Sequence, residues 1–90
     1  MKQGEFYQKY TNFGNFNRMT YIYIVSYLDG EIIRDMYWID IMNNRKYDVT
    51  IREGDSCSES EIQDKYEICN EMSFRNFIAF VLEARKIEGR

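Results

Sequence analysis

The clearest pattern in this chain is a pair of alternating stretches joined by Asp29-Gly30. Residues 20–28 and residues 31–41 both alternate between two kinds of apolar side chain, with few polar positions. Successive side chains of a β-strand point to opposite faces of the sheet, so this period of two predicts two strands. Asp-Gly suits a two-residue hairpin turn, because both turn positions need a positive φ. We therefore expect an antiparallel hairpin.

The turn predicts which side chains share a face of this hairpin. With Leu28 opposite Glu31, one face would be mainly aliphatic and would hold Ile22, Ile24, Ile33, Tyr37 and Ile39. The other face, mainly aromatic, would pair Tyr27 with Ile32, Val25 with Arg34, Tyr23 with Met36 and Tyr21 with Trp38. Because a sheet with one solvated face alternates apolar and polar residues, and this one does not, we expect both faces to be covered.

A third strand is predicted at residues 45–52, after Asn43-Asn44. A two-residue loop would place Tyr47, Val49 and Ile51 on the aromatic face, and a three-residue loop over residues 42–44 would place them on the aliphatic face. The second alternative puts Asn44 in the left-handed conformation, which asparagine tolerates well. We favour it because it gathers the aliphatic residues into one core, although a single bulge would reverse the faces.

The C-terminal third is predicted to be helical over residues 58–87. Ser58 and Glu61 form a capping-box pattern before apolar residues at 62, 66 and 69, although a short strand at residues 65–70 is the alternative. Ser73 is placed to cap a second helix, whose apolar stripe is Phe74, Phe77, Ile78, Val81 and Leu82. We expect this second helix to cover the aliphatic face of the sheet.

The N-terminal residues 1–18 form an aromatic arm. Phe6, Tyr10 and Phe13 have helical spacing, and Gly14 could end such a short helix. The arm either packs on the sheet or inserts into a partner or a second copy of the chain. We thus expect one small α+β domain over residues 1–90, with a three-stranded or four-stranded antiparallel meander at residues 19–52. The C-terminal helix or helices would pack on one face.

Composition argues against catalysis. The 90 residues include no histidine, so the commonest general base and metal ligand are missing, and the five glycines form no phosphate-binding loop. Cys57 and Cys69 fit neither a disulfide framework nor a zinc motif. We therefore expect no enzymatic activity, no metal and no cofactor. Residues 87–90 read like a factor Xa cleavage sequence, so they are either a remnant of cloning or native residues.

No apolar run reaches membrane-spanning length and no signal-peptide pattern begins the chain, so we expect a cytoplasmic protein that does not enter a membrane. The net charge is −3, and residues 53–71 hold seven acidic residues against one lysine. Such a segment is typical of a solvated surface or of one that meets a basic partner. The abundant Ile, Asn, Lys and Tyr indicate an AT-rich genome, such as that of a low-GC bacterium or its phages.

Two functions remain. The favoured one is a protein-binding module, because Tyr, Trp, Met and Arg are enriched at interface hot spots. In its size, acidity and lack of catalytic motifs, the chain resembles small phage or mobile-element inhibitors and adaptors, which occupy a surface of a host or defence protein. The predicted contact residues are Tyr21, Tyr23, Tyr27, Arg34, Met36, Trp38, Glu61, Asp64 and Glu67. The alternative is stacking of single-stranded nucleic acid on the aromatic face, which the acidic charge disfavours. A homodimer through that face or the arm is also expected.

Overall fold

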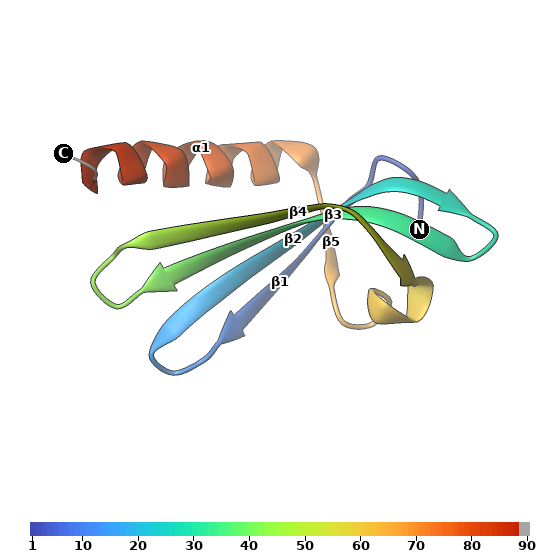
Figure 1. Cartoon of the computed structure of the whole chain (residues 1–90), viewed down its shortest axis with the longest axis horizontal. Coiled ribbons are helices and arrows are strands. Elements are labelled where there is room, and N and C mark those ends of the chain that lie inside the picture. Colours follow the sequence, from blue (N-terminus) through green and yellow to red (C-terminus); the bar gives the residue numbers. More distant parts are fainter. Residues whose placement is uncertain (89–90) are drawn as a thin grey trace.

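A five-stranded antiparallel sheet with one long helix on one face makes up the fold (Figure 1). The computed structural model describes the backbone of residues 1–88 and the side chains of residues 1–84. The strands are β1 (Phe6–Asn12), β2 (Phe16–Leu28), β3 (Glu31–Met42), β4 (Tyr47–Ser58) and β5 (Glu67–Cys69). A 3₁₀ turn, η1 (Glu59–Glu61), follows β4, and the helix α1 (Glu71–Glu88) ends the chain. In space the strand order is β4-β3-β2-β1-β5.

The α+β class, the antiparallel meander and the C-terminal helix are confirmed, whereas the predicted number of strands is wrong. The N-terminal arm is strand β1, which pairs with β2 from Phe6 opposite Tyr23 to Asn12 opposite Asn17. Phe6 and Tyr10 are four residues apart, a spacing that puts two side chains on one side of a helix and also on one face of a strand. That spacing therefore could not distinguish the two structures.

The fifth strand lies where a helix was favoured. The helical stretch after Ser58 stops after η1, and the alternative strand at residues 65–70 is confirmed as β5, which pairs with the start of β1. Asp64 has a φ of 64°, a left-handed conformation that breaks the helix. The predicted capping box of Ser58 and Glu61 is present at the start of η1, where the Ser58 N–H donates to the Glu61 carboxylate at 2.9 Å.

Helix α1 begins earlier than its apolar stripe indicated. Asn70, rather than Ser73, caps it, since the Asn70 side-chain oxygen accepts a hydrogen bond from the Ser73 N–H at 2.7 Å. The stripe itself is confirmed on the sheet side: Phe74, Phe77, Ile78 and Val81 pack against the strands, and Val81 is fully buried. Leu82 instead lies on the flank of the helix and is exposed.

A bulge at Val25 reverses the predicted faces of β2. The pairs nearest the turn, Leu28 with Glu31 and Tyr27 with Ile32, are confirmed. Beyond the bulge the register shifts by one residue, so that Ile24 pairs with Arg34 and Ile22 pairs with Met36. The predicted pairs beyond the bulge (Val25–Arg34, Tyr23–Met36 and Tyr21–Trp38) are therefore wrong. A slip of one residue moves every side chain of the strand to the other face.

The sheet consequently has two apolar faces of mixed composition. On the helix face, Tyr21, Tyr37 and Ile39 pack beneath α1. On the opposite face, which we call the back face, a second cluster consists of Ile22, Ile24, Ile32, Met36, Cys57 and Ile62. Ile62 follows η1, so the segment 59–66 covers one end of the back face. The prediction that Ile22 and Ile24 lie under the helix is wrong, because both lie on the back face.

The third predicted strand has the expected orientation. Tyr47, Val49 and Ile51 of β4 pair with Ile41, Ile39 and Tyr37, which places them on the helix face. The turn differs in detail, because the Met42 N–H bonds to the Lys46 carbonyl and Arg45, not Asn44, has the positive φ of 63°. A shift of two residues leaves the face unchanged, so the prediction survives this difference.

The suggested cleavage remnant at residues 87–90 is described only in part, because residues 89 and 90 lie outside the described residues. Within the described part of the chain, no helix combines the length and the apolar character that spanning a membrane requires.

A charge at Ile24 tests the second cluster. Ile24 is 0 % exposed, so Ile24→Asp buries a carboxylate whose nearest cation, Arg34, is already paired with Asp55, and the change should abolish cooperative unfolding. The matched control is Leu28→Asp on the same strand, where the side chain is 73 % exposed and the change should leave stability nearly as in the wild type. Circular dichroism during thermal unfolding measures both. A normally folded Ile24→Asp protein would contradict the placement of this residue in a core.

The tyrosines predict loss of stability at alkaline pH. Burial, a hydrogen bond to Glu5 and nearby carboxylates raise the pKa of Tyr7 to about 12, and burial raises the pKa of Tyr21, Tyr37 and Tyr66. The folded chain therefore holds protons that the unfolded chain releases near pH 10, so the free energy of unfolding should fall between pH 10 and 12. Urea unfolding across this range measures it. Tyr7→Phe should make the decrease less steep, and an unchanged slope would contradict the assignment.

Candidate interaction surface

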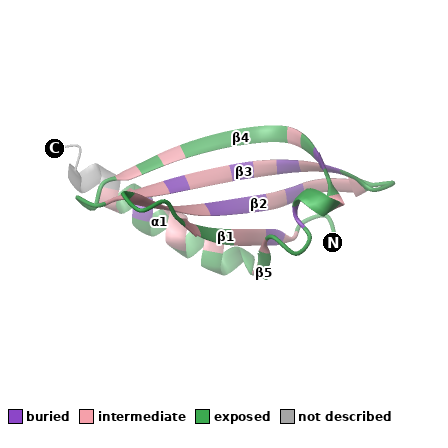
Figure 2. Cartoon of the chain, turned by 90° about the horizontal axis from the view of Figure 1, so that it is seen from below, coloured by how far each residue is buried: buried purple, intermediate pink, exposed green. Residues whose placement is uncertain are grey.

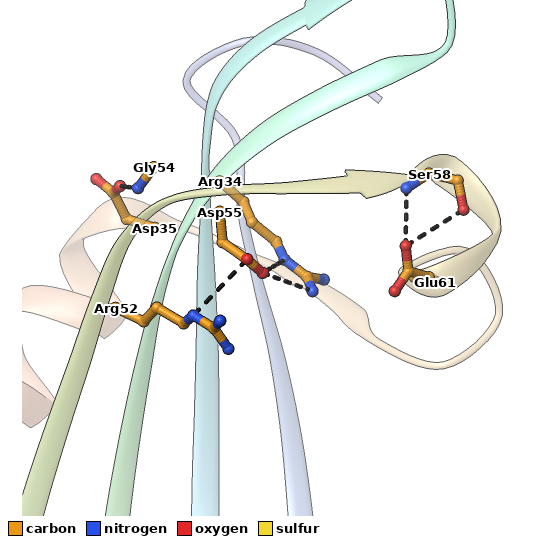
Figure 3. A network of polar contacts seen from close by, with 7 residues as sticks. All are labelled: Arg34, Asp35, Arg52, Gly54, Asp55, Ser58 and Glu61. Atoms are coloured by element: carbon orange, nitrogen blue, oxygen red, sulfur yellow. Dashed lines mark hydrogen bonds and ion pairs between the residues drawn. The ribbon is translucent and has the colours of Figure 1, made fainter.

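Two bulges opposite the middle of β3 position polar groups on both faces of the sheet. The Val25 bulge lies in β2, and in β4 residues 53 and 54 together oppose Asp35. Gly54 has a φ of 69°, and its N–H donates to the Asp35 carboxylate at 3.0 Å (Figure 3). Bulges bend a sheet, and Figure 1 shows β2, β3 and β4 changing direction near this level.

Arg34, a predicted contact residue, lies at this bend and has a structural role. Its guanidinium donates to the Asp55 carboxylate at 3.3 and 3.2 Å from two nitrogens (Figure 3). Arg52 approaches the other oxygen of Asp55 at 3.7 Å. The Arg34 side chain is only 10 % exposed, so it is largely unavailable to a partner.

The predicted aromatic site is divided between the two faces. Tyr21 and Tyr23 lie on the helix face, where Tyr21 is buried against Phe74 and Tyr23 contacts Phe6. Met36 is buried in the cluster beneath Ile62. On the back face Tyr27 donates a hydrogen bond to Glu59 at 2.8 Å, and that bond raises its pKa. Trp38 is half-buried at the border of the same cluster.

The predicted acidic residues are exposed but do not form one helical face. Glu61 lies in η1, Asp64 in the left-handed turn and Glu67 in β5. Glu61 accepts the capping hydrogen bond of Ser58, whereas Glu67 lines a shallow groove beside β1. All three carboxylates remain accessible to water. Glu61 and Asp64 lie in the segment that covers one end of the back face, whereas Glu67 lies opposite Gln8 of β1 and faces the helix side of the sheet.

The other end of the back face is open (Figure 2). Viewed from that side, no described helix or loop covers the end near the β1–β2 and β3–β4 turns. The side chains that gather there are Phe13, Phe16, Arg18, Trp38 and Asp40; we call this group the open half. Arg18 pairs with Asp40 across β2 and β3, and Trp38 is the next residue of β3 on the same face.

Stacking and charge pairing hold the open half in place. The rings of Phe13 and Phe16 stack with centroids 4.8 Å apart, and the Arg18 guanidinium lies 5.2 and 5.7 Å from them. The same guanidinium donates to both Asp40 carboxylate oxygens, at 2.6 and 3.1 Å. That hydrogen bonding raises the pKa of Arg18. A bidentate pair with two aromatic neighbours restricts the guanidinium, so little entropy is lost when a partner contacts it.

The remaining candidate groups offer little chemistry. A shallow groove of about 340 Å³ lies beside β1, and Gln8, Lys9, Tyr10, Met19, Lys65 and Glu67 line it. Among the described residues, no three cysteine or acidic side chains are grouped so as to hold a metal ion. Cys57 is buried and Cys69 is half-buried, and both are free thiols. Burial raises the pKa of each thiol, so both favour the unreactive protonated form.

Comparison with known proteins adds no assignment. No family model matches the chain, and the curated proteins and solved structures give no match either.

Of the residues in the open half, only Trp38 was among the contact residues predicted from the sequence. Phe13, Phe16 and Arg18 were missed because the β1–β2 hairpin was not predicted. A signal for that hairpin does exist, because Gly14-Asn15 separates two alternating stretches, and Gly14 has a φ of 90°. Reading this turn would have placed the two phenylalanines and the arginine at the tip of a hairpin.

Arg34 should contribute more to stability than an arginine of an exposed ion pair. Arg34→Met removes a side chain that is 10 % exposed and leaves Asp55, which is 22 % exposed, without its closest cation, so it should lower the free energy of unfolding by about 2 kcal/mol. Arg75→Met is the control, because the Arg75 and Glu71 side chains of its ion pair are 67 % and 56 % exposed, and should cost about 1 kcal/mol or less. Urea unfolding at neutral pH measures both. Equal costs would contradict the structural role given to Arg34.

Proposed function

We propose that this protein is a non-catalytic protein-binding module, an inhibitor or adaptor that works by occupying a surface of another protein. The observation that carries the proposal is the open half, where two phenylalanines, an arginine and a tryptophan lie together on an uncovered sheet face. Arg and aromatic residues are enriched at interface hot spots because they bury much area at little entropic cost. Phe13 is 49 % exposed and stacks on Phe16, so its ring presents apolar surface to a partner.

The acidic residues support a basic partner. Glu61 and Asp64 are exposed in the segment that covers one end of the back face, and Glu67 is exposed on the helix side of the sheet beside β1. Exposed carboxylates speed the encounter with a positive surface and suppress wrong partners, while contributing less to the final affinity. The proposed division is therefore an aromatic contact in the open half and electrostatic steering from the acidic segment.

Single-stranded nucleic acid is the weaker candidate. Aromatic side chains on a sheet can stack bases, and Lys9, Arg18, Arg45 and Lys46 could contact phosphates. Asp40, however, already neutralises Arg18, and Asp48 lies on the same face beside Asp40. Binding of this kind requires a clear positive surplus around the aromatic residues. The pairing of Arg18 with Asp40 thus favours a protein partner.

Truncation of the open half should weaken partner binding. A partner is captured from a low-GC bacterial lysate, purified, and its affinity is measured by calorimetry. Phe13→Ala and Trp38→Ala should each weaken binding by about 2 kcal/mol or more if these rings are hot spots. Leu28→Ala is the control, because Leu28 is as apolar and exposed but lies at the opposite end of β2. Equal affinities for all three variants would refute this interface, and quenching of Trp38 by single-stranded DNA would favour the alternative.

Charge reversal should change the kinetics instead. Replacing Glu61, Asp64 and Glu67 together by lysine should slow association by tenfold or more at low salt and flatten its salt dependence. Dissociation should change little, because these carboxylates are outside the proposed hot spot. Stopped-flow mixing at several salt concentrations measures both rates. An association rate as fast and as salt-dependent as that of the wild type would remove the acidic segment from the proposal.

A further inference from the structure

Strand β4 leaves its outer edge without a partner. It is the terminal strand of the sheet order, and no described segment pairs with its outer side. Of its twelve residues only Cys57 is buried, and residues 47–52 contain neither proline nor lysine. Long regular edges of this kind are templates for pairing with another strand, so native proteins usually block them. Here the bulge at residues 53 and 54 interrupts the edge, which leaves residues 47–52 regular.

The hydrogen-bonding phase of β4 shows which backbone groups are free. The Met42 N–H donates to the Lys46 carbonyl at 2.9 Å, so the backbone carbonyl of Lys46 points toward β3 and not toward the outer edge. Hydrogen-bonded and non-hydrogen-bonded pairs alternate along an antiparallel ladder. The backbone groups of residues 48, 50 and 52 therefore face β3, and those of Tyr47, Val49 and Ile51 point outward. A second strand can pair only with this outward set.

We infer that the occupant of this edge is β4 of a second copy of the chain, paired antiparallel about a two-fold axis at Thr50. In that register Asp48 lies opposite Arg52 of the second copy, and Val49 lies opposite Ile51 of the second copy. Both charge pairs fall on the back face and both apolar pairs fall on the helix face. Two antiparallel copies of residues 48–52 therefore place opposite charges against each other and apolar residues against each other.

Other registers lose this complementarity. An axis at Asp48 or at Arg52 sets like charges directly opposite each other, which is destabilising. An axis at Val49 or at Ile51 leaves one charged residue opposite Thr50. Asp48 already lies opposite Asp40 within its own sheet, so an added arginine relieves a like-charge neighbour. Charge therefore selects the axis at Thr50.

Exposed apolar side chains mark the same edge. Ile51 is 55 % exposed, and Phe80 of α1 is 59 % exposed while its ring contacts Tyr47 at 6.0 Å between centroids. Both lie on the helix face beside β4. An antiparallel pairing with its two-fold axis perpendicular to the sheet keeps both helices on that face. The dimer would therefore cover apolar surface that the single chain leaves in water.

A disulfide across the axis tests the register. In Cys57→Ser/Cys69→Ser protein, Thr50→Cys would face its own copy in a non-hydrogen-bonded pair, with Cα atoms about 4.5 Å apart, within reach of a disulfide. The matched control is Lys46→Cys at the same edge, where the two copies would lie about 27 Å apart. Mild oxidation followed by non-reducing electrophoresis should give a linked dimer of the first variant only. Equal linking of both variants would overturn the register.

Charge exchange provides a test without cysteine. Asp48→Arg and Arg52→Asp each make both pairs repulsive and should weaken self-association about tenfold or more. Mixed together, the two variants regain opposite charges and should form a heterodimer. Sedimentation equilibrium of the full chain measures the masses, and circular dichroism confirms that each variant folds. A wild-type protein that stays monomeric at high micromolar concentration would overturn the proposal and leave the edge to a strand of another protein.

Discussion

Two bulges, one in each of the strands that flank β3, are the constraint on which the rest of the structure depends. Val25 adds a residue to β2 and Gly54 adds one to β4 at nearly the same level of the sheet. The first bulge moves the isoleucines of β2 onto the back face, and the second aims Asp55 at Arg34. Without them the back face would have neither its apolar cluster nor its central ion pair.

A sheet with two apolar faces needs more cover than this chain supplies. Helix α1 covers one face, and the segment 59–66 covers half of the other by inserting Ile62. Among the described residues, Trp38 and the Arg18–Asp40 pair protect the remaining half, with two stacked phenylalanines beside them. The open half therefore leaves both apolar surface and a fixed charge pair accessible.

Features that depend on local chemistry were predicted correctly from the sequence. Features that depend on one extra residue in a strand, which decides the face of every side chain beyond it, were not. The Asp29-Gly30 turn, the face of Tyr47 and the apolar stripe of α1 follow from turn chemistry and periodicity. The faces of β2 beyond Val25 do not, because no residue type there signals a bulge. Of the predicted contact residues, Trp38 lies in the open half, whereas Arg34 and Met36 are largely buried. Composition alone therefore could not locate the interface that we propose.

The open half and the free edge of β4 are neighbours, because Trp38 and Asp40 of the open half lie directly opposite Thr50 and Asp48 of β4. The edge proposed for self-pairing involves backbone groups in the plane of the sheet, whereas the open half lies on the surface of the sheet, so pairing would leave its aromatic side chains uncovered. A two-fold axis perpendicular to the sheet at Thr50 would place the open halves of both copies on the same face of the joined sheet, one on each side of the axis. A dimer could then hold two partner surfaces at once, so its avidity would exceed the affinity of one copy wherever the partner is itself repeated or dimeric.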